Sequence, residues 1–216
     1  MLAVCCTGSD SATKKFCRPA SSGAPTSVRR ASFGSDGERF FAKALPRLVF
    51  IDETSTNTRL TKRTGWAPEG QRYRTHAAFG QWKTQTFIAG LRCHGMIAPW
   101  IIDAPMNGRR FETWVETQLV PQLRPGDVVI LDNVAFHKSE RAAELVRRSG
   151  AWMLFLPPYS PDLNPIEMAF SKLKAILRKK AARTFEAISN ALRNICALFD
   201  PIQCRNFFKA AGYEGD

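Results

Sequence analysis

Long apolar segments are absent from this sequence. No run approaches the roughly 20 apolar residues that a membrane-spanning helix needs. The opening stretch, residues 1–6, is too short for the core of a signal peptide and lacks its basic start. Paired cysteines are absent as well, because none of the six cysteines forms a C-x-x-C pair. These absences exclude a membrane span, argue against a zinc site and lead us to expect a soluble intracellular protein.

Acidic residues are scarce relative to basic ones. The chain has 31 Lys and Arg against 19 Asp and Glu, which gives a net charge of +12 and a pI of about 9.8. Such an excess favours a polyanionic partner, with nucleic acid as the obvious candidate, although a merely basic surface has the same composition. With 216 residues, 44% of them hydrophobic, the chain suits one globular domain with a sizeable core.

Hydrophobic periodicity is lacking over residues 1–40, which are rich in Ser, Gly, Thr and Ala. We expect an irregular, disordered leader there. No pair of helices joined by a turn can be recognised in it, so no helix-turn-helix domain is expected in this segment. Residues 41–216 carry the patterns of a folded domain.

The folded part begins with strands joined by short connections and continues with alternating helices and strands. This order predicts a mixed sheet with helices on both faces and a right-handed parallel crossover. Strands are expected at residues 47–52, 72–78, 83–92, 97–103, 128–131 and 152–156, the last two of them buried, and residues 53–70 are expected to form a loop. Helices are expected at residues 107–123, 139–148, 164–182, 184–199 and 204–212, with Asn107, Ser139 and Asn164 as N-caps of the first three.

Three carboxylates lie at the ends of predicted strands or at the start of a predicted helix. Asp52 and Asp132 each end a short apolar strand, and Glu167 lies in the first turn of a predicted helix. Because ligands gather at the carboxyl ends of strands in open sheets, the three can form one cluster. Such a cluster repels itself unless cations fill it, and hard oxygen ligands favour Mg²⁺ or Mn²⁺.

Each of these acidic residues also has a purely local explanation. Asp52 or Asp132 alone can cap the turn after its strand. Glu167 follows Asn164 at the spacing of a capping box, in which the glutamate bonds back to the cap residue, and the spacing alone favours that interpretation. The neighbouring Glu53 is a weaker candidate, because it should point to the opposite face of its strand from Asp52.

Three motifs resemble one known family. The segments LVFIDET (48–54), LDN (131–133) and PPYSPDLNPIE (157–167) resemble the DDE endonuclease domain of mariner-related bacterial insertion-sequence transposases, and the likeness extends from about residue 47 to residue 213. The resemblance implies an α/β, ribonuclease-H-like (retroviral-integrase-like) fold with a mixed five-stranded sheet and helices on both faces. It also implies that Asp52, Asp132 and Glu167 are the catalytic residues and hold two Mg²⁺ or Mn²⁺ ions.

The same resemblance implies an activity and its partners. The activity is metal-dependent cleavage and transfer of DNA strands, and the substrates are double-stranded element ends and target DNA in a bacterial cytoplasm, at the nucleoid. A separate or frameshift-joined helix-turn-helix domain and a homodimer are implied as partners. Two alternatives remain open, namely a structure-specific nuclease of the same fold and an inactive remnant that only binds DNA.

Further residues are candidates for supporting roles. Asn133 can orient Asp132 or a bound water, and His137 can contact a scissile phosphate, although either can also be structural. DNA contacts are expected from basic residues in the 53–70 loop and along the helix that begins near Glu167, although a solvated surface explains the loop residues equally well. These basic residues are Arg59, Lys62, Arg63, Lys174, Arg178, Lys179 and Lys180.

Overall fold

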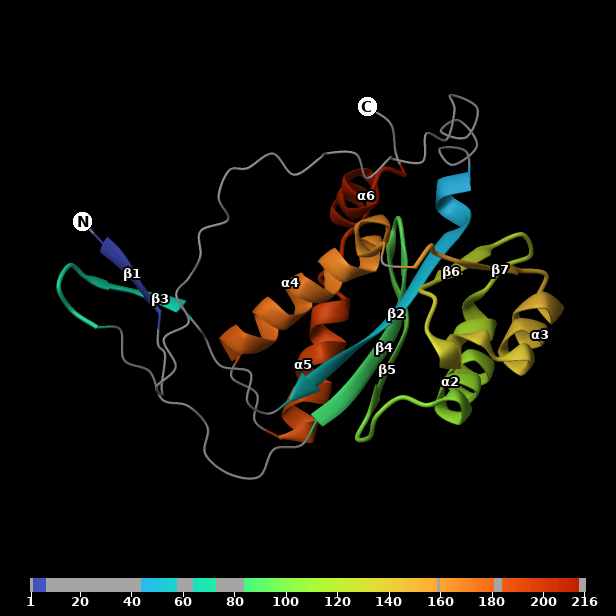
Figure 1. The fold of residues 1–216 in the computed structure, drawn as a ribbon, viewed down its shortest axis with the longest axis horizontal. Helices are drawn as coiled ribbons and strands as arrows, with labels where there is room; N and C mark the ends of the chain where they lie inside the picture. Colours follow the sequence, from blue (N-terminus) through green and yellow to red (C-terminus); the bar gives the residue numbers. More distant parts are fainter. Residues whose placement is uncertain are drawn as a thin grey trace.

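A mixed five-stranded sheet in the order β5-β4-β2-β6-β7 forms the centre of the protein (Figure 1). The computed structural model describes residues 2–6, 44–57, 64–72, 84–158, 160–180 and 184–213. The first three strands of the sheet pair antiparallel, and β6 and β7 are parallel to β2, so the expected mixed sheet is confirmed. The strands are β2 (Leu48–Asn57), β4 (Thr84–Arg92), β5 (Gly95–Ile102), β6 (Val128–Leu131) and β7 (Trp152–Phe155).

Helices cover both faces of this sheet, as Figure 1 shows. One face carries α2 (Gly108–Trp114) and α3 (Glu140–Arg148), and the other carries α4 (Pro165–Lys180), α5 (Phe185–Cys196) and α6 (Pro201–Ala210). Within the described ranges, no helix is long and apolar enough to cross a membrane.

Strand β2 separates two apolar cores. Leu48 and Phe50 point into the core beneath α4, α5 and α6, whereas Val49 and Ile51 point into the core beneath α2 and α3. All four side chains are at most 1% exposed, which explains why the strand is a continuous apolar run rather than an alternating one. Helix α4 packs into the first of these cores through an apolar stripe formed by Ile166, Phe170, Leu173 and Leu177.

Local capping signals place two helices as predicted. The Asn107 side chain accepts a hydrogen bond from the Arg110 backbone N–H (2.9 Å), and Ser139 Oγ accepts one from the Ala142 N–H (3.2 Å). The expected helix over 107–123 is confirmed in its extent, but its second half is not a regular α-helix. After α2 the chain widens into a π-helix, Val115–Leu119, and closes with a 3₁₀ turn, Val120–Gln122. Pro121 lies in that turn and cannot donate to a regular helix.

Asp200 places the last helix earlier than expected. Its side chain accepts a hydrogen bond from the Gln203 N–H (2.8 Å) and Pro201 occupies the first turn, so α6 begins at Pro201 rather than at residue 204.

The expected buried strand at residues 152–156 is instead an exposed edge. Trp152 is 69% exposed, Leu154 50% and Phe155 42%. The reason is the strand order, since among the described strands β7 pairs with β6 alone and forms the end of the sheet. An apolar run therefore identified the strand correctly but not its position in the sheet.

The segment after Asp52 also differs from expectation. Strand β2 continues to Asn57 because its antiparallel pairing with β4 continues to Thr84, so Asp52 lies inside a strand and not at its end. The expected loop at 53–70 also contains β3 (Thr64–Pro68), which pairs with β1 (Leu2–Cys6). Most of the expected leader and of the expected strand at 72–78 lies outside the described residues.

A buried ion pair fixes the turn that precedes β6. Arg92, at the end of β4, pairs through Nη2 with Oδ2 of Asp127, and both side chains are at most 6% exposed. The same Nη2 donates to the Gln122 carbonyl (3.1 Å), and Asp127 Oδ2 also accepts from the Arg124 backbone N–H (2.7 Å). The pair thus joins the end of β4 to the turn before β6.

Candidate active site

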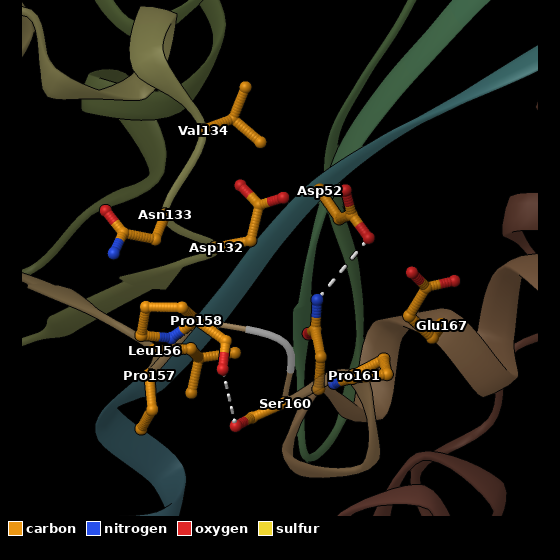
Figure 2. A pocket seen from close by; sticks show the side chains of 11 residues that line it. Asp52, Asp132, Asn133, Val134, Leu156, Pro157, Pro158, Ser160, Pro161 and Glu167 are labelled. Carbon is orange, nitrogen blue, oxygen red and sulfur yellow. Dashed lines mark hydrogen bonds between the residues drawn. The ribbon is translucent and has the colours of Figure 1, made fainter.

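A cavity of about 370 Å³ opens where β6 ends beside the middle of β2 and the start of α4. Figure 2 shows the carboxylates of Asp52, Asp132 and Glu167 around it, which come from β2, from the chain directly after β6 and from α4. The rest of the lining comes from the chain after β6 and from the proline-rich segment before α4, with Asn133, Val134, Leu156, Pro157, Pro158, Ser160, Pro161 and Asn164.

Strand register brings the two aspartates together. Strands β2 and β6 are parallel, and Ile51 is the pairing partner of Leu131. The next residue in each case is an aspartate, within β2 for Asp52 and just after β6 for Asp132, so the two lie side by side although 80 positions (132 − 52) separate them. The predicted proximity of these two carboxylates is therefore explained by pairing, even though only β6 ends there.

Glu167 joins them from the first turn of α4. Its carboxylate is directed into the pocket toward Asp52 in Figure 2. The capping-box alternative does not hold, because the Asn164 amide is turned to Asp52, with Nδ2 donating to Oδ2 over 3.4 Å, and its Oδ1 has no hydrogen-bond partner in the described structure. The predicted side-chain cap at Asn164 is thus wrong, and a contact across the fold replaces the local one.

The surroundings of Asp52 are unfavourable for a negative charge. Its side chain is 7% exposed. Burial is the largest cause that raises its pKa to about 8, followed by the carboxylates of Glu167, Glu53 and, more weakly, Asp132. A hydrogen bond from the Glu53 backbone N–H (2.7 Å) acts in the opposite direction. A cation beside Asp52 would therefore be strongly favoured.

The donors present are those that a hard divalent cation takes. Three carboxylates line the cavity, and the buried Asn164 Oδ1, 4% exposed as a residue, has no partner of its own. Within the described ranges, no three His, Cys, Asp or Glu side chains converge closely enough to enclose an ion as they stand. Carboxylates repel one another when no cation lies between them. The lining therefore offers the donor atoms that a cation needs, although its carboxylates remain separated.

Buried His137 bridges two acidic residues. Its Nδ1 lies 2.5 Å from Asp132 Oδ1 and its Nε2 lies 3.0 Å from Glu53 Oε2, while the imidazole itself is 0% exposed. Burial lowers the pKa of His137, but the hydrogen bonds to Asp132 and Glu53 outweigh it and bring that pKa to about 9. Both ring nitrogens therefore carry protons at neutral pH and donate to the two carboxylates.

This bridge changes the roles expected from the sequence. Both nitrogens of His137 are already engaged, so the expected contact with a scissile phosphate is not available to it in this arrangement. Glu53 follows Asp52 on β2 and points to the opposite face of the strand, as expected. It is nevertheless connected to Asp132 through His137, a role that the sequence did not predict. The only signal in the sequence was the placement of Glu53 directly after one aspartate and of His137 five positions after the other.

The remaining candidates are distributed as follows. Asn133 is exposed and its amide points away from the Asp132 carboxylate in Figure 2. Lys174 and Arg178 are half-buried on α4, and Lys179 and Lys180 are exposed at its end. The other expected DNA contacts, Arg59, Lys62 and Arg63, lie outside the described residues.

The raised pKa of Asp52 predicts a pH dependence of stability without metal. The folded protein holds a proton on Asp52 up to about pH 8, whereas the unfolded chain releases it near the ordinary value of 3.8. The native state therefore binds more protons between these two values, and its free energy of unfolding should fall as pH rises through that window. Asp52→Asn removes this loss.

Urea unfolding in EDTA at several pH values between 4 and 8 measures the effect. The wild type and Asp52→Asn should have similar free energies of unfolding at about pH 4, and Asp52→Asn should be the more stable at pH 8. Each kcal/mol of difference in the free energy of unfolding corresponds to about 2–4 °C in melting temperature. Parallel pH curves for the two proteins would contradict this prediction.

Comparison with known proteins identifies the family. A family model described as DDE superfamily endonuclease matches residues 47–189, about two thirds of the chain. No curated protein matches.

Solved structures of a mariner transposase share the fold. The Mos1 strand transfer complex matches with a TM-score of 0.65 at 18% identity over 81% of this chain and 55% of that one. The Mos1 paired end complex with Mn matches with a TM-score of 0.62 at 18% identity over 81% and 56%. The isolated Mos1 catalytic domain matches with a TM-score of 0.55 at 16% identity over 81% and 82%.

These likenesses confirm the ribonuclease-H-like fold. The chain spans only about half the length of the transposase chains in the Mos1 complexes, and most of the isolated catalytic domain. The family model covers all three motifs and the three pocket carboxylates, and the fold agrees with it. The chain therefore belongs to the DDE superfamily endonuclease family.

Proposed function

We propose that this chain is the catalytic domain of a DNA transposase, which cleaves DNA strands and joins them to a target with the help of divalent metal ions. One observation carries the proposal. Asp52, Asp132 and Glu167, from three separate parts of the chain, line a single cavity in a fold shared with a mariner transposase catalytic domain. We assign these three residues as the catalytic carboxylates.

Two Mg²⁺ or Mn²⁺ ions are proposed as cofactors. Asp52, Asp132 and Glu167 are the residues that would hold the ions. Oxygen donors, the raised pKa of Asp52 and the unpartnered Asn164 Oδ1 support this choice, and related Mos1 complexes are described with Mn and with Mg. When bound, such ions supply charge neutralisation at the attacking and leaving oxygens of an in-line phosphoryl transfer.

The protein's own part in the reaction is to hold its carboxylates in place. Asp52 is fixed by the Glu53 backbone N–H and by the Asn164 amide, and Asp132 by His137. Glu167 is carried on α4, whose apolar stripe anchors it in the core. Ser160 lines the cavity, but its hydroxyl donates to the Pro158 carbonyl (3.4 Å), and we assign it no nucleophilic role.

The proposed substrates are double-stranded element ends and target DNA. Support comes from the net charge of +12 and from neighbours described as complexes with a transposon end. We further propose that a separate or frameshift-joined helix-turn-helix domain recognises the ends, that two copies of the chain bring the ends together, and that the protein acts at the nucleoid of a bacterial host.

The basic residues of α4 form the proposed DNA track. Lys174 and Arg178 follow Glu167 at helical spacing, and Lys179 and Lys180 extend the charge beyond them. Changing all four to alanine should flatten the dependence of log K on log[salt] by about 0.9 per lost phosphate contact, so by up to roughly 3–4 in all. Fluorescence anisotropy with labelled duplex DNA at several salt concentrations measures this slope.

A matched control lies on α3. Arg147 and Arg148 are at least 73% exposed and pair with Glu144 on the opposite face of the sheet from α4. Their double alanine variant should leave the slope nearly unchanged. Equal slopes for the wild type and the α4 variant would show that these four residues do not contact DNA.

The proposed activity is tested with supercoiled plasmid and with labelled DNA taken from the flanks of the coding sequence. Mg²⁺- or Mn²⁺-dependent nicking, lost in EDTA, together with joined products is the expected result. Nicking with no joined product, even when a helix-turn-helix partner is supplied, would indicate a structure-specific nuclease of the same fold. DNA binding with no cleavage under any of these conditions would indicate an inactive remnant.

A further inference from the structure

Asp132 differs from Asp52 in how the fold supports it. Strand β6 ends at Leu131, so Asp132 stands on the chain that leaves the sheet, and its side chain is 39% exposed. Asp52, by contrast, lies inside β2 and is buried between paired strands. A carboxylate at such a strand end can rotate freely unless another group holds it.

His137 is the group in contact with it. The imidazole is carried by a 3₁₀ turn, Ala135–Lys138, and its ring packs against Phe111 and Phe136 at centroid distances of 4.7 and 4.5 Å. This packing fixes the ring plane, and the Nδ1–Oδ1 distance of 2.5 Å then fixes one oxygen of Asp132. The other oxygen of Asp132 remains for the cavity.

Glu53 completes the arrangement from the strand that carries Asp52. Its carboxylate accepts from Nε2 over 3.0 Å and is 19% exposed. A polar ring at 0% exposure is costly to bury unless both of its nitrogens have partners, and Glu53 provides the second partner. His137 thereby links Glu53, the neighbour of Asp52 on β2, to Asp132, which follows β6.

We propose that Glu53 and His137 are positioning residues that hold the Asp132 carboxylate in the orientation needed to bind a divalent cation. This inference rests on the proposed function, because it concerns the same site. Neither residue is part of the cavity lining, and both would act through Asp132. Outer residues that orient metal ligands typically contribute 10–100-fold to metal affinity or activity.

The test is direct binding of Mn²⁺ to the full chain by titration calorimetry, together with the Mn²⁺ concentration that gives half-maximal plasmid nicking. His137→Ala should weaken Mn²⁺ binding about 10–100-fold, and Glu53→Ala should weaken it less. Glu53→Gln, which can still accept a hydrogen bond from Nε2, should restore most of the loss. Metal-free binding to duplex DNA should not change in any of these variants.

His94→Ala is the control. His94 is exposed in the turn between β4 and β5, so this variant should bind Mn²⁺ as tightly as the wild type. Melting temperatures in EDTA identify any variant that fails to fold, in which case Glu53→Ala and Glu53→Gln decide. Folded variants that bind Mn²⁺ as tightly as the wild type would overturn the positioning role alone. A wild-type chain that neither binds Mn²⁺ nor nicks DNA would instead overturn the proposed function.

Discussion

Replacing Asp132 by alanine should reduce metal-dependent nicking of supercoiled DNA by about 10³-fold or more. A divalent cation stabilises the charge that develops in phosphoryl transfer by several kcal/mol, and each 1.36 kcal/mol corresponds to a factor of ten in rate. The substitution removes a carboxylate that lines the cavity and also leaves His137 without one of its two partners. Quantifying open-circular plasmid against time, in Mg²⁺ and in Mn²⁺, gives the rate ratio.

Asp162→Ala is the matched control. Asp162 is an exposed aspartate in the 3₁₀ turn Pro161–Leu163, close to the cavity but not part of its lining. Its variant should nick DNA at nearly the wild-type rate and show the same loss in EDTA. Retention of more than about a tenth of wild-type activity by Asp132→Ala would mean that Asp132 is not a metal ligand in the reaction, since losing even 1.36 kcal/mol slows it tenfold.

Replacing Arg92 by methionine should lower the free energy of unfolding by about 3–5 kcal/mol, because removing one partner of a buried ion pair leaves the other charge uncompensated. Here the stranded charge is Asp127, which is 4% exposed on its side chain. The variant also loses the hydrogen bond to the Gln122 carbonyl. Urea unfolding at neutral pH measures the change, and the loss should appear as a melting temperature lower by roughly 6–20 °C.

An exposed pair provides the comparison. Arg141 and Glu116 lie 3.0 Å apart with side chains 63% and 49% exposed, so Arg141→Met should cost no more than about 1 kcal/mol. Adding Asp127→Leu to Arg92→Met should recover much of the lost stability, since an apolar replacement of both partners is often tolerated. Equal effects of the Arg92 and Arg141 substitutions would show that the buried pair does not stabilise the turn before β6.

The centre of the sheet could be predicted from the sequence because its strands are buried on both faces. Leu48 to Ile51 and Val128 to Leu131 are uninterrupted apolar runs, and such runs are typical of parallel strands between two layers of helices. Each is followed by an aspartate, so the parallel register is enough to bring Asp52 and Asp132 together. Apolar composition does not distinguish a central strand from an edge strand, which is why the exposure of β7 was not predicted.

The contacts that support the carboxylates could not be predicted in the same way. The Asn164 side chain matches a helix cap by sequence, yet it bonds to Asp52, 112 residues away. Glu53 is adjacent to Asp52 on a strand, and the two-residue period correctly separates their faces. That period says nothing of His137, which reaches Glu53 from a turn 84 residues later. Strand alternation predicts which face of the sheet a side chain points to, whereas the residue that it contacts there depends on the tertiary structure.

The three carboxylates of the cavity also leave the ribosome at different times. Glu167 follows Asp52 by 115 residues (167 − 52), which corresponds to roughly 6–23 s of synthesis at about 5–20 residues per second. During that interval the nascent chain contains β2, and later β6, but not the helix that brings the third carboxylate and closes the first core. A polypeptide whose translation stops in this interval therefore lacks one of the three carboxylates that line the cavity of the finished chain.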